Sequence, residues 1–311
     1  MAPSNQRAEV LGESAQTSDK SAIGIALIIA ASLIVPFADG FVKLIANDYS
    51  ALQLVWLRYG LQSLFLLPIM LWWYGANAFV TQHPVSQALR SLFIGGGALC
   101  FFSAVRYIPL ADAVAVFFVQ PFIVTTLAPL LLGERVGAWR WTAVFAGFLG
   151  ALIVIRPGFE GVNVGTLYAL GAGACFAMFA ILTRRVGVSD PPMVTNFLTG
   201  LGVTLLATPA IPFLWVTPSA ADVPIILTFA TFGACFSLLF TMAYAYATAS
   251  ALAPFTYVEL LGAVVAGYLM FGDLPDGYTW LGMAVISVSG LVIVWRENRL
   301  RKSQLIVPVE N

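Results

Sequence analysis

The feature that most constrains this chain is a series of apolar stretches, each long enough to form a helix that crosses a bilayer. Such a helix needs about 20 mostly apolar residues to span a hydrocarbon layer of roughly 30 Å. Ten stretches meet this requirement, and short connections with turn residues separate them. The sequence therefore predicts an all-α integral membrane protein with ten transmembrane helices. They cover residues 22–42, 51–74, 86–105, 110–132, 138–156, 162–184, 192–215, 223–246, 251–271 and 278–295.

Composition excludes a water-soluble fold. Apolar residues make up 60% of the chain and charged residues only 10%, whereas a soluble domain carries roughly 25% charged residues. The formal net charge is zero, so nothing indicates a nucleic-acid partner. We expect the lipid bilayer and a small-molecule substrate as partners, and a monomer or a homodimer.

The ends of the chain and its cysteines predict little chemistry. Residues 1–20 are polar and lack the apolar run of a signal peptide, so we expect a disordered cytoplasmic tail, with a second tail over 298–311. The three cysteines lie in apolar runs without metal-binding spacing, and the single histidine, His83, lies in a loop. We therefore predict no metal site and no cofactor.

The positive charges predict the orientation, because Lys and Arg accumulate on the cytoplasmic side. An N-terminus in the cytoplasm leaves only Lys43, Arg106 and Arg156 in outer loops. Both termini are therefore expected on the cytoplasmic side of a bacterial inner membrane. The cytoplasmic segments then hold Arg7, Lys20, Arg90, Arg135, Arg140, Arg184, Arg185, Arg296, Arg299, Arg301 and Lys302.

The chain contains an internal repeat. Residues 104–141 align without gaps on 243–280, which pairs Gly133-Glu134 with Gly272-Asp273. The first helices of the halves also align, with Lys43 on Arg184. Five helices per repeat is an odd number, so the second half must enter the membrane from the opposite side. Inverted repeats of this kind occur in secondary transporters, whose substrate site lies at the repeat interface near the midplane.

Three local patterns strengthen this interpretation. They are the fourth-helix segment YIPLADAVAVF over 107–117, the ending Leu132-Gly-Glu-Arg135, and Ile155-Arg-Pro-Gly158 at the end of the fifth helix. Together with the five-plus-five arrangement, they resemble the EamA branch of the drug/metabolite transporter superfamily over residues 22–296. The second half departs from the pattern, because Asp273 stands where Glu is usual and no Arg follows it.

The resemblance implies two EamA-like five-helix repeats, over 21–158 and 159–297, around a central cavity with alternating access. It implies a substrate such as an amino acid, a nucleotide-like compound, a vitamin such as riboflavin or an amphiphile. It leans toward export, although similar proteins import vitamins.

Glu259 is the most informative polar residue, because it lies near the middle of the ninth predicted helix. A charge at that depth costs about 3 kcal/mol on insertion scales unless it faces a cavity or a partner. We interpret Glu259 as a substrate-binding or proton-coupling carboxyl; the alternative is a neutral acid bonded to a neighbouring helix. Its repeat mate, Gln120, can orient a ligand or bond to another helix. Pro121 also frees a backbone carbonyl one turn earlier.

Charged residues toward the outer half are candidates for a gate. Arg58 either reaches the cavity, where it binds an anionic group or an acid, or extends to the outer interface. Asp39 and Asp112 either pair with Arg58 or Arg106 as an outer gate or are plain interfacial acids. At the cytoplasmic end, Glu134 and Arg135 tie helices together or form an inner gate.

Aromatic residues around Gln120 and Glu259 suit a planar or amphipathic ligand. The predicted substrate-binding set is therefore Glu259, Gln120, Arg58, Tyr59, Trp56, Phe117 and Tyr257.

The predicted function is a secondary transporter that moves a small metabolite, driven by the substrate gradient or a proton gradient. No nucleotide-binding loop occurs in the sequence. The chain also lacks the catalytic sets expected of a membrane enzyme, so we predict that it is not an enzyme. A channel or a membrane sensor is the remaining alternative.

Overall fold

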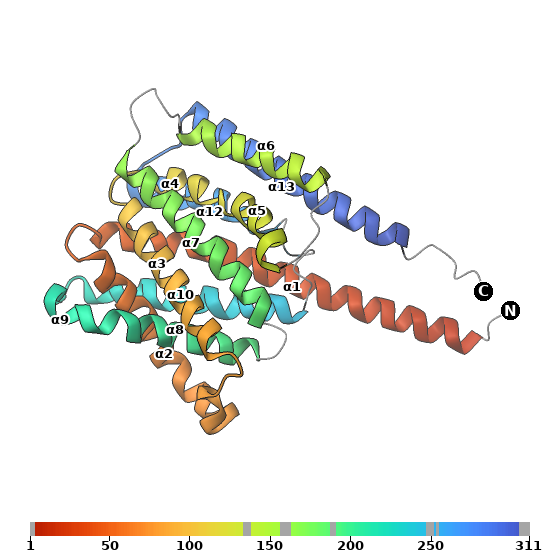
Figure 1. Ribbon diagram of the computed structural model, residues 1–311, viewed down its shortest axis with the longest axis horizontal. Coiled ribbons are helices and arrows are strands. Elements are labelled where there is room, and N and C mark those ends of the chain that lie inside the picture. Colours follow the sequence, from red (N-terminus) through yellow and green to blue (C-terminus); the bar gives the residue numbers. More distant parts are fainter. Residues whose placement is uncertain are drawn as a thin grey trace.

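The computed structural model describes residues 4–132, 138–155, 163–186, 191–246, 252 and 255–304. This part of the chain is helical and contains no strand. The long helices are packed side by side, and both ends of the chain lie at the same end of the bundle (Figure 1). The helices are α1 (Ser4–Ile45), α2 (Ala51–Tyr74), η1 (Gly75–Phe79), α3 (Pro84–Ala104), α4 (Leu110–Phe117), α5 (Gln120–Leu132), α6 (Ala138–Ile155), α7 (Val164–Val186), α8 (Pro192–Ala207), η2 (Thr208–Ala210), α9 (Ile211–Leu214), α10 (Val223–Tyr246), α12 (Val258–Phe271) and α13 (Gly277–Gln304).

Seven helical segments of the described chain are long and apolar enough to cross a membrane. Three further apolar helices are shorter, over Phe145–Ile155, Val258–Phe271 and Gly277–Val292. The prediction of an all-helical membrane protein is therefore confirmed. The seven long segments are Ala22–Ile45, Ala51–Phe79, Pro84–Ala104, Leu110–Leu127, Val164–Thr183, Met193–Leu214 and Val223–Phe240.

Several helix boundaries differ from the predicted ones. α1 begins at Ser4, within the predicted tail, because the Ala, Gln, Glu and Arg residues there favour a helix without being apolar. α13 likewise continues into the predicted second tail. The seventh predicted helix ends early at Ala207, since Pro209 and Pro212 interrupt the regular hydrogen bonding and divide its end into η2 and α9.

Local sequence signals explain where several helices begin and end. The hydroxyl of Ser50 accepts a 3.1 Å bond from the Gln53 amide and caps α2. A carboxyl oxygen of Asp276 accepts a 2.9 Å bond from the Thr279 amide and caps α13. At the C-terminal end of α12, Gly272 takes a left-handed conformation with φ of 72°, which glycine adopts without steric penalty.

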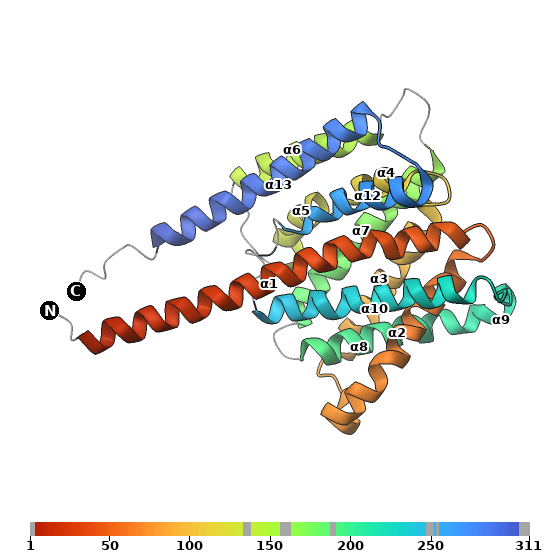
Figure 2. The same cartoon turned by 180° about the vertical axis from the view of Figure 1, so that it is seen from behind.

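Small residues allow the helices to approach closely, as membrane packing requires. α6 and α13 lie together along one edge of the bundle, visible in both ribbon views (Figures 1 and 2). A Cβ atom on Gly150 would lie 2.9 Å from the backbone oxygen of Gly282. The α3–α7 contact is similar, since a Cβ on Gly97 would lie 3.3 Å from the Cβ of Cys175. Gly97 therefore lets α3 and α7 approach closely.

The largest hydrophobic core joins the central helices. It contains buried residues of α1, α2, α3, α4 and α12, among them Leu54, Phe102, Val114 and Leu260. Within this arrangement α1 packs on α10 and α12, α7 packs on α3, α4 and α5, and α2 packs on α8. The helices that carry the predicted site residues thus meet in the middle of the molecule.

Candidate functional site

The fourth predicted helix is broken at its middle, and this break positions Gln120. α4 ends at Phe117, and α5 begins at Gln120. Pro121 has no amide hydrogen, so the carbonyl of Phe117 lacks its regular helical donor. Gly173 of α7 covers this carbonyl, because a Cβ on that glycine would lie 2.8 Å from the Phe117 oxygen. The predicted free carbonyl therefore marks a helix discontinuity.

A second discontinuity precedes α12 and positions Glu259. Tyr257 is a turn residue, and α12 begins directly after it at Val258. Glu259 thus lies in the first turn of α12. The alignment of the two halves pairs Tyr257 with Phe118, so the discontinuities occupy equivalent positions. Both interrupt helices that the apolar pattern alone had predicted as continuous.

The two discontinuities contact each other. The rings of Phe118 and Tyr257 lie 5.4 Å apart at 31°. Gln120 and Glu259 follow these aromatic residues by two positions each, and both side chains are half-buried. Within the part of the chain that the structure describes, neither the Gln120 nor the Glu259 side chain forms a hydrogen bond that would explain its position. The ring contact joins the two discontinuities, and the pairing of Gln120 with Glu259 at one site stays a prediction.

A buried ion pair joins α1 and α2. Nη1 of Arg58 donates a 3.2 Å bond to a carboxyl oxygen of Asp39, and both side chains are at least nine-tenths buried. Arg58 therefore does not extend to the outer interface. Asp39 pairs with Arg58, one of the two arginines predicted as its partner.

The position of Arg58 is held from several sides. Its guanidinium lies 5.6 Å from the ring centre of Phe102 on α3 and 5.9 Å from that of Tyr59. Gly233 of α10 packs against it, because a Cβ there would lie 3.0 Å from Nε of Arg58. Nε is buried and has no hydrogen-bond partner among the described residues. Of the predicted substrate-binding residues, Tyr59 shares this buried environment and is 9% exposed.

The remaining aromatic candidates divide between two places. Tyr257 lies at the discontinuity, with its hydroxyl against Gly290 of α13. Phe117 lies nearby but packs into the α3–α7 contact, 5.3 Å from the ring of Phe176. Trp56 contacts η2 instead. Its indole NH donates a 3.0 Å bond to Thr208.

The end of the bundle opposite the termini is tied together by polar contacts, and Figure 2 shows the α1–α2 turn and α9 there. Lys43 and Asp273 form an ion pair of 3.1 Å between residues 230 positions apart. The predicted gate residue Asp112 accepts a 2.9 Å bond from the hydroxyl of Thr279. Further contacts of this kind join Tyr49 to Asp222, Gln53 to Val216 and Arg106 to the backbone of Tyr49.

Sequence reasoning missed the Lys43–Asp273 pair. The repeat alignment had singled out both residues, as the equivalents of Arg184 and Glu134, so it was the part of the sequence analysis from which their pairing could have been predicted. The other predicted gate residues, Glu134 and Arg135, lie outside the described residues.

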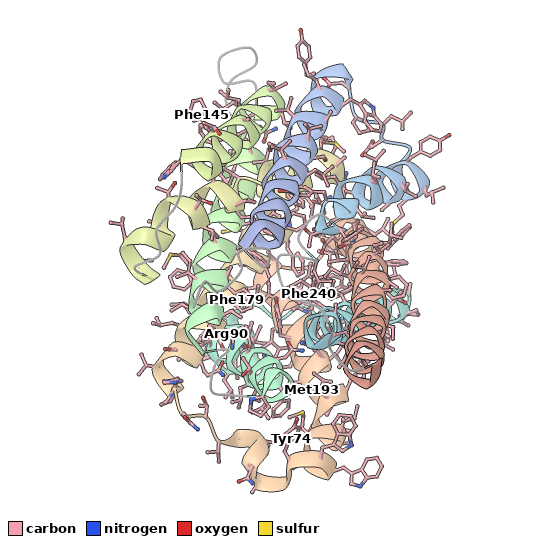
Figure 3. All side chains as sticks on the ribbon, turned by 90° about the vertical axis from the view of Figure 1, so that its right-hand side faces the viewer. Tyr74, Arg90, Phe145, Phe179, Met193 and Phe240 are labelled. Atoms are coloured by element: carbon pink, nitrogen blue, oxygen red, sulfur yellow. The ribbon has the colours of Figure 1, made fainter. Side chains whose placement is uncertain are left out.

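A second buried arginine, Arg90, was expected only as a cytoplasmic charge. It is 3% exposed on α3. Its Nε donates a 3.1 Å bond to Thr183, and Nη1 donates a 2.7 Å bond to Gln87. Figure 3 shows Arg90 beside Phe179, whose ring centre lies 5.1 Å from the guanidinium. Arg90 thus joins α3 to α7 near the end that carries the termini.

Comparisons with known proteins agree with this architecture. The model of the EamA-like transporter family matches twice, over residues 22–156 and 163–296. The two matches correspond closely to the two predicted repeats.

Curated relatives cover most of the chain. An S-adenosylmethionine uptake transporter of Rickettsia prowazekii is 26% identical over 86% of this chain and 90% of its own. A riboflavin transporter of Rhizobium johnstonii is 32% identical over 78% of this chain and 80% of its own. A pseudopaline exporter of Pseudomonas aeruginosa is 23% identical over 87% and 95%.

Among solved structures, one crystal structure matches with a TM-score of 0.57 at 19% identity, over 91% of this chain and 99% of its own. At that identity the likeness shows the fold alone.

Proposed function

Because the chain belongs to the EamA-like transporter family, we propose that it is a secondary transporter that moves a small metabolite across the inner membrane by alternating access. The observation that carries this proposal is the pair of helix discontinuities at equivalent positions of the two halves. In transporters with inverted repeats, discontinuous helices form the substrate site near the membrane midplane. Here each discontinuity places one of the two predicted site residues, Gln120 or Glu259, in the first turn of a helix.

Helix packing supports two inverted repeats of five helices. In the predicted alignment α1 corresponds to α7, and α3 corresponds to α10. The contact of α1 with α10 then has its equivalent in the contact of α7 with α3. The seven long apolar helices and three shorter ones together support ten spans. Termini at one end of the bundle fit an even number of spans (Figure 1), and the distribution of Lys and Arg favours the cytoplasm for that end.

Contacts between the two halves support alternating access. The Lys43–Asp273 ion pair and the Asp112–Thr279 bond join the two halves at the end opposite the termini. In the proposed orientation this is the outer end. These contacts must break when the site opens outward, so we assign them to an outer gate that is closed in this structure.

The relatives suggest what the site can carry. Those named for S-adenosylmethionine and riboflavin both transport molecules with flat ring systems and polar groups. The Phe118–Tyr257 pair beside Gln120 and Glu259 suits such a molecule, since flat faces and a few polar groups fix its orientation. We propose transport of an amphipathic metabolite without chemical change, with the substrate or proton gradient as the driving force.

Uptake by membrane vesicles tests this function and determines the direction. Right-side-out and inverted vesicles containing the protein are supplied with labelled S-adenosylmethionine or riboflavin. We expect saturable uptake of at least one compound, in both orientations for a reversible carrier. Flux that rises linearly with concentration, without saturation, would instead indicate a channel. Absence of flux for both compounds would contradict the proposed substrate class.

Cross-linking of the proposed outer gate tests alternating access, and single-cysteine variants serve as the matched control. The variant combines Lys43→Cys and Asp273→Cys in a chain whose native cysteines, Cys100, Cys175 and Cys235, are replaced by serine. A short bismaleimide should join the two new cysteines and stop uptake. Each single-cysteine variant should keep its uptake after the same treatment. Undiminished uptake by the cross-linked protein would refute alternating access through this gate.

A further inference from the structure

The first part of α2 is bonded to a segment from the other half of the chain. Gln53 and Trp56 lie one turn apart on α2, and Tyr49 stands just before it. All three side chains form hydrogen bonds to residues of 208–222, which includes η2, α9 and the connection to α10. We call these contacts the outer clasp, because they lie at the end of the bundle opposite the termini.

Gln53 is the centre of the outer clasp. Its Nε2 donates a 2.7 Å bond to the carbonyl of Val216, and its Oε1 accepts a 3.0 Å bond from the Val216 amide. Val216 belongs to no helix, so Gln53 provides the bonds that a helix would otherwise give to its backbone. The Gln53 side chain is fully buried. Separation of α2 from this segment would therefore leave a buried amide without partners, which is costly.

Two further contacts extend the outer clasp on either side of Gln53. The Tyr49 hydroxyl donates a 2.6 Å bond to the Asp222 carboxylate and accepts a 3.1 Å bond from the Ser219 amide. The indole ring of Trp56 meets that of Trp215 edge-on at 6.1 Å. The clasp thus holds its segment near both ends as well as in the middle.

The Lys43–Asp273 pair of the outer gate is a weaker link between the halves. It is a single contact, and its side chains are 18% and 43% exposed. Ion pairs open to water contribute little to stability, because solvent replaces the lost partner. The clasp instead depends on a fully buried side chain with two bonds. Opening at the outer end should therefore break the gate and leave the clasp intact.

The same helices are also joined deeper in the bundle. Gln62 of α2 donates a 3.3 Å bond to Ser237 of α10, whose hydroxyl donates a 2.8 Å bond to Asn196 of α8. α8 lies close to α2, because a Cβ on Gly200 would lie 2.8 Å from the hydroxyl of Ser63. Both ribbon views show α2, α8 and α10 side by side (Figures 1 and 2). This group combines one helix of the first half with two of the second.

We infer that α2 and the chain from α8 to α10 stay joined when the outer gate opens, so that the unit that moves contains helices of both repeats. This inference rests on the proposed transport function and goes beyond it, since alternating access alone does not determine which helices move together. Gln53 is a positioning residue, because it acts through the backbone of Val216.

A cross-link within the clasp tests the inference against the cross-linked gate. The variant combines Tyr49→Cys and Asp222→Cys in the chain whose native cysteines are serine, and it receives the same short bismaleimide. Each of the two cysteine pairs replaces a long side chain and an aspartate that are bonded to each other. We expect no loss of vesicle uptake from the cross-linked clasp, whereas the cross-linked gate stops uptake. Loss of uptake in the clasp variant, with each single-cysteine variant unaffected, would overturn the inference.

Hydrogen exchange of the purified full-length protein gives a readout that does not depend on transport. Residues 215–219 lie outside the helices, so protection of the Val216 amide has to come from its bond to Gln53. We expect this amide to exchange about fivefold faster in Gln53→Ala, the change expected for loss of one hydrogen bond. Exchange within α10 should be the same in both proteins and serves as the control for folding.

The two measurements separate this inference from the proposed function. Equal exchange of the Val216 amide in the wild type and in Gln53→Ala, with α10 unchanged, would overturn the clasp even in a protein that transports normally. If no variant takes up either compound, the transport proposal fails. Slower exchange in the wild type would in that case still support a permanent junction of α2 with this segment.

Discussion

The two helix discontinuities occupy equivalent positions but differ in chemistry. The one between α4 and α5 carries an amide, Gln120, and is caused by Pro121. The one before α12 carries an acid, Glu259, and no proline stands at the equivalent position there. Two halves with a common architecture therefore contribute unequal charge to one site. In the transport cycle that we propose, symmetry of the backbone lets the molecule open to either side, and asymmetry of the side chains orients the substrate.

Moving the acid from one discontinuity to the other should have the largest effect. In the variant Gln120→Glu/Glu259→Gln, the number of acids is unchanged, but the acid moves from the start of α12 to the start of α5. We expect uptake to fall about tenfold or more, the result of losing about 1.4 kcal/mol or more of binding. Initial rates in vesicles measure this. Normal uptake would show that the two discontinuities are interchangeable.

Filling the space behind the first discontinuity should destabilise the protein. A Cβ from Gly173→Ala would lie 2.8 Å from the Phe117 oxygen and 2.9 Å from a methyl of Val119. Overpacking of this kind costs about 1–3 kcal/mol. Thermal unfolding in detergent measures the loss. The control is Gly96→Ala on α3, whose Cβ would meet Cys175 only at 3.7 Å; a similar loss there would disprove a special role for Gly173.

Removing the cause of the first discontinuity should separate function from stability. Pro121→Ala supplies an amide hydrogen that can bond the Phe117 carbonyl, which is worth about 1 kcal/mol. We expect an equal or higher unfolding temperature together with slower uptake, because α4 and α5 become one straight helix. Thermal unfolding and vesicle uptake are measured on the same preparation. A variant that is less stable yet transports normally would contradict the role assigned to this discontinuity.

A small, pH-dependent effect is expected at the outer end, away from both discontinuities. The hydroxyls of Ser219 and Tyr49 each donate a 2.6 Å bond to the Asp222 carboxylate and hold its pKa below the ordinary value of 3.8. Asp222 therefore contributes stability above its unfolded-state pKa, and this contribution disappears as the pH falls through the lowered folded-state pKa.

The variant Tyr49→Phe removes one of these bonds, so the pKa of Asp222 should rise toward its ordinary value. The midpoint of acid unfolding should then move slightly to higher pH, while vesicle uptake at neutral pH stays as in the wild type. A changed uptake would show that transport depends on this bond as well as on the two discontinuities.

Much of the architecture could be predicted from the sequence, because bilayer thickness and helix geometry act locally. The apolar stretches predicted the helices near their observed places, and the repeat alignment identified Gln120 and Glu259 as a pair. Pro121 indicated the free carbonyl, although not that the helix would divide there. The turn before Glu259 had no comparable signal, since no proline stands at the position of Leu260.

The tertiary structure decided how the charges are shared. From sequence, Arg58 could serve the substrate, an acid or the membrane surface; only packing by Asp39, Phe102 and Gly233 assigns it to an ion pair. It likewise joined Trp56 to Thr208 and brought Lys43 to Asp273 across 230 residues. The physical reason is that hydrophobicity along a helix is a property of neighbouring residues, whereas the neutralisation of a buried charge depends on which distant helix lies beside it.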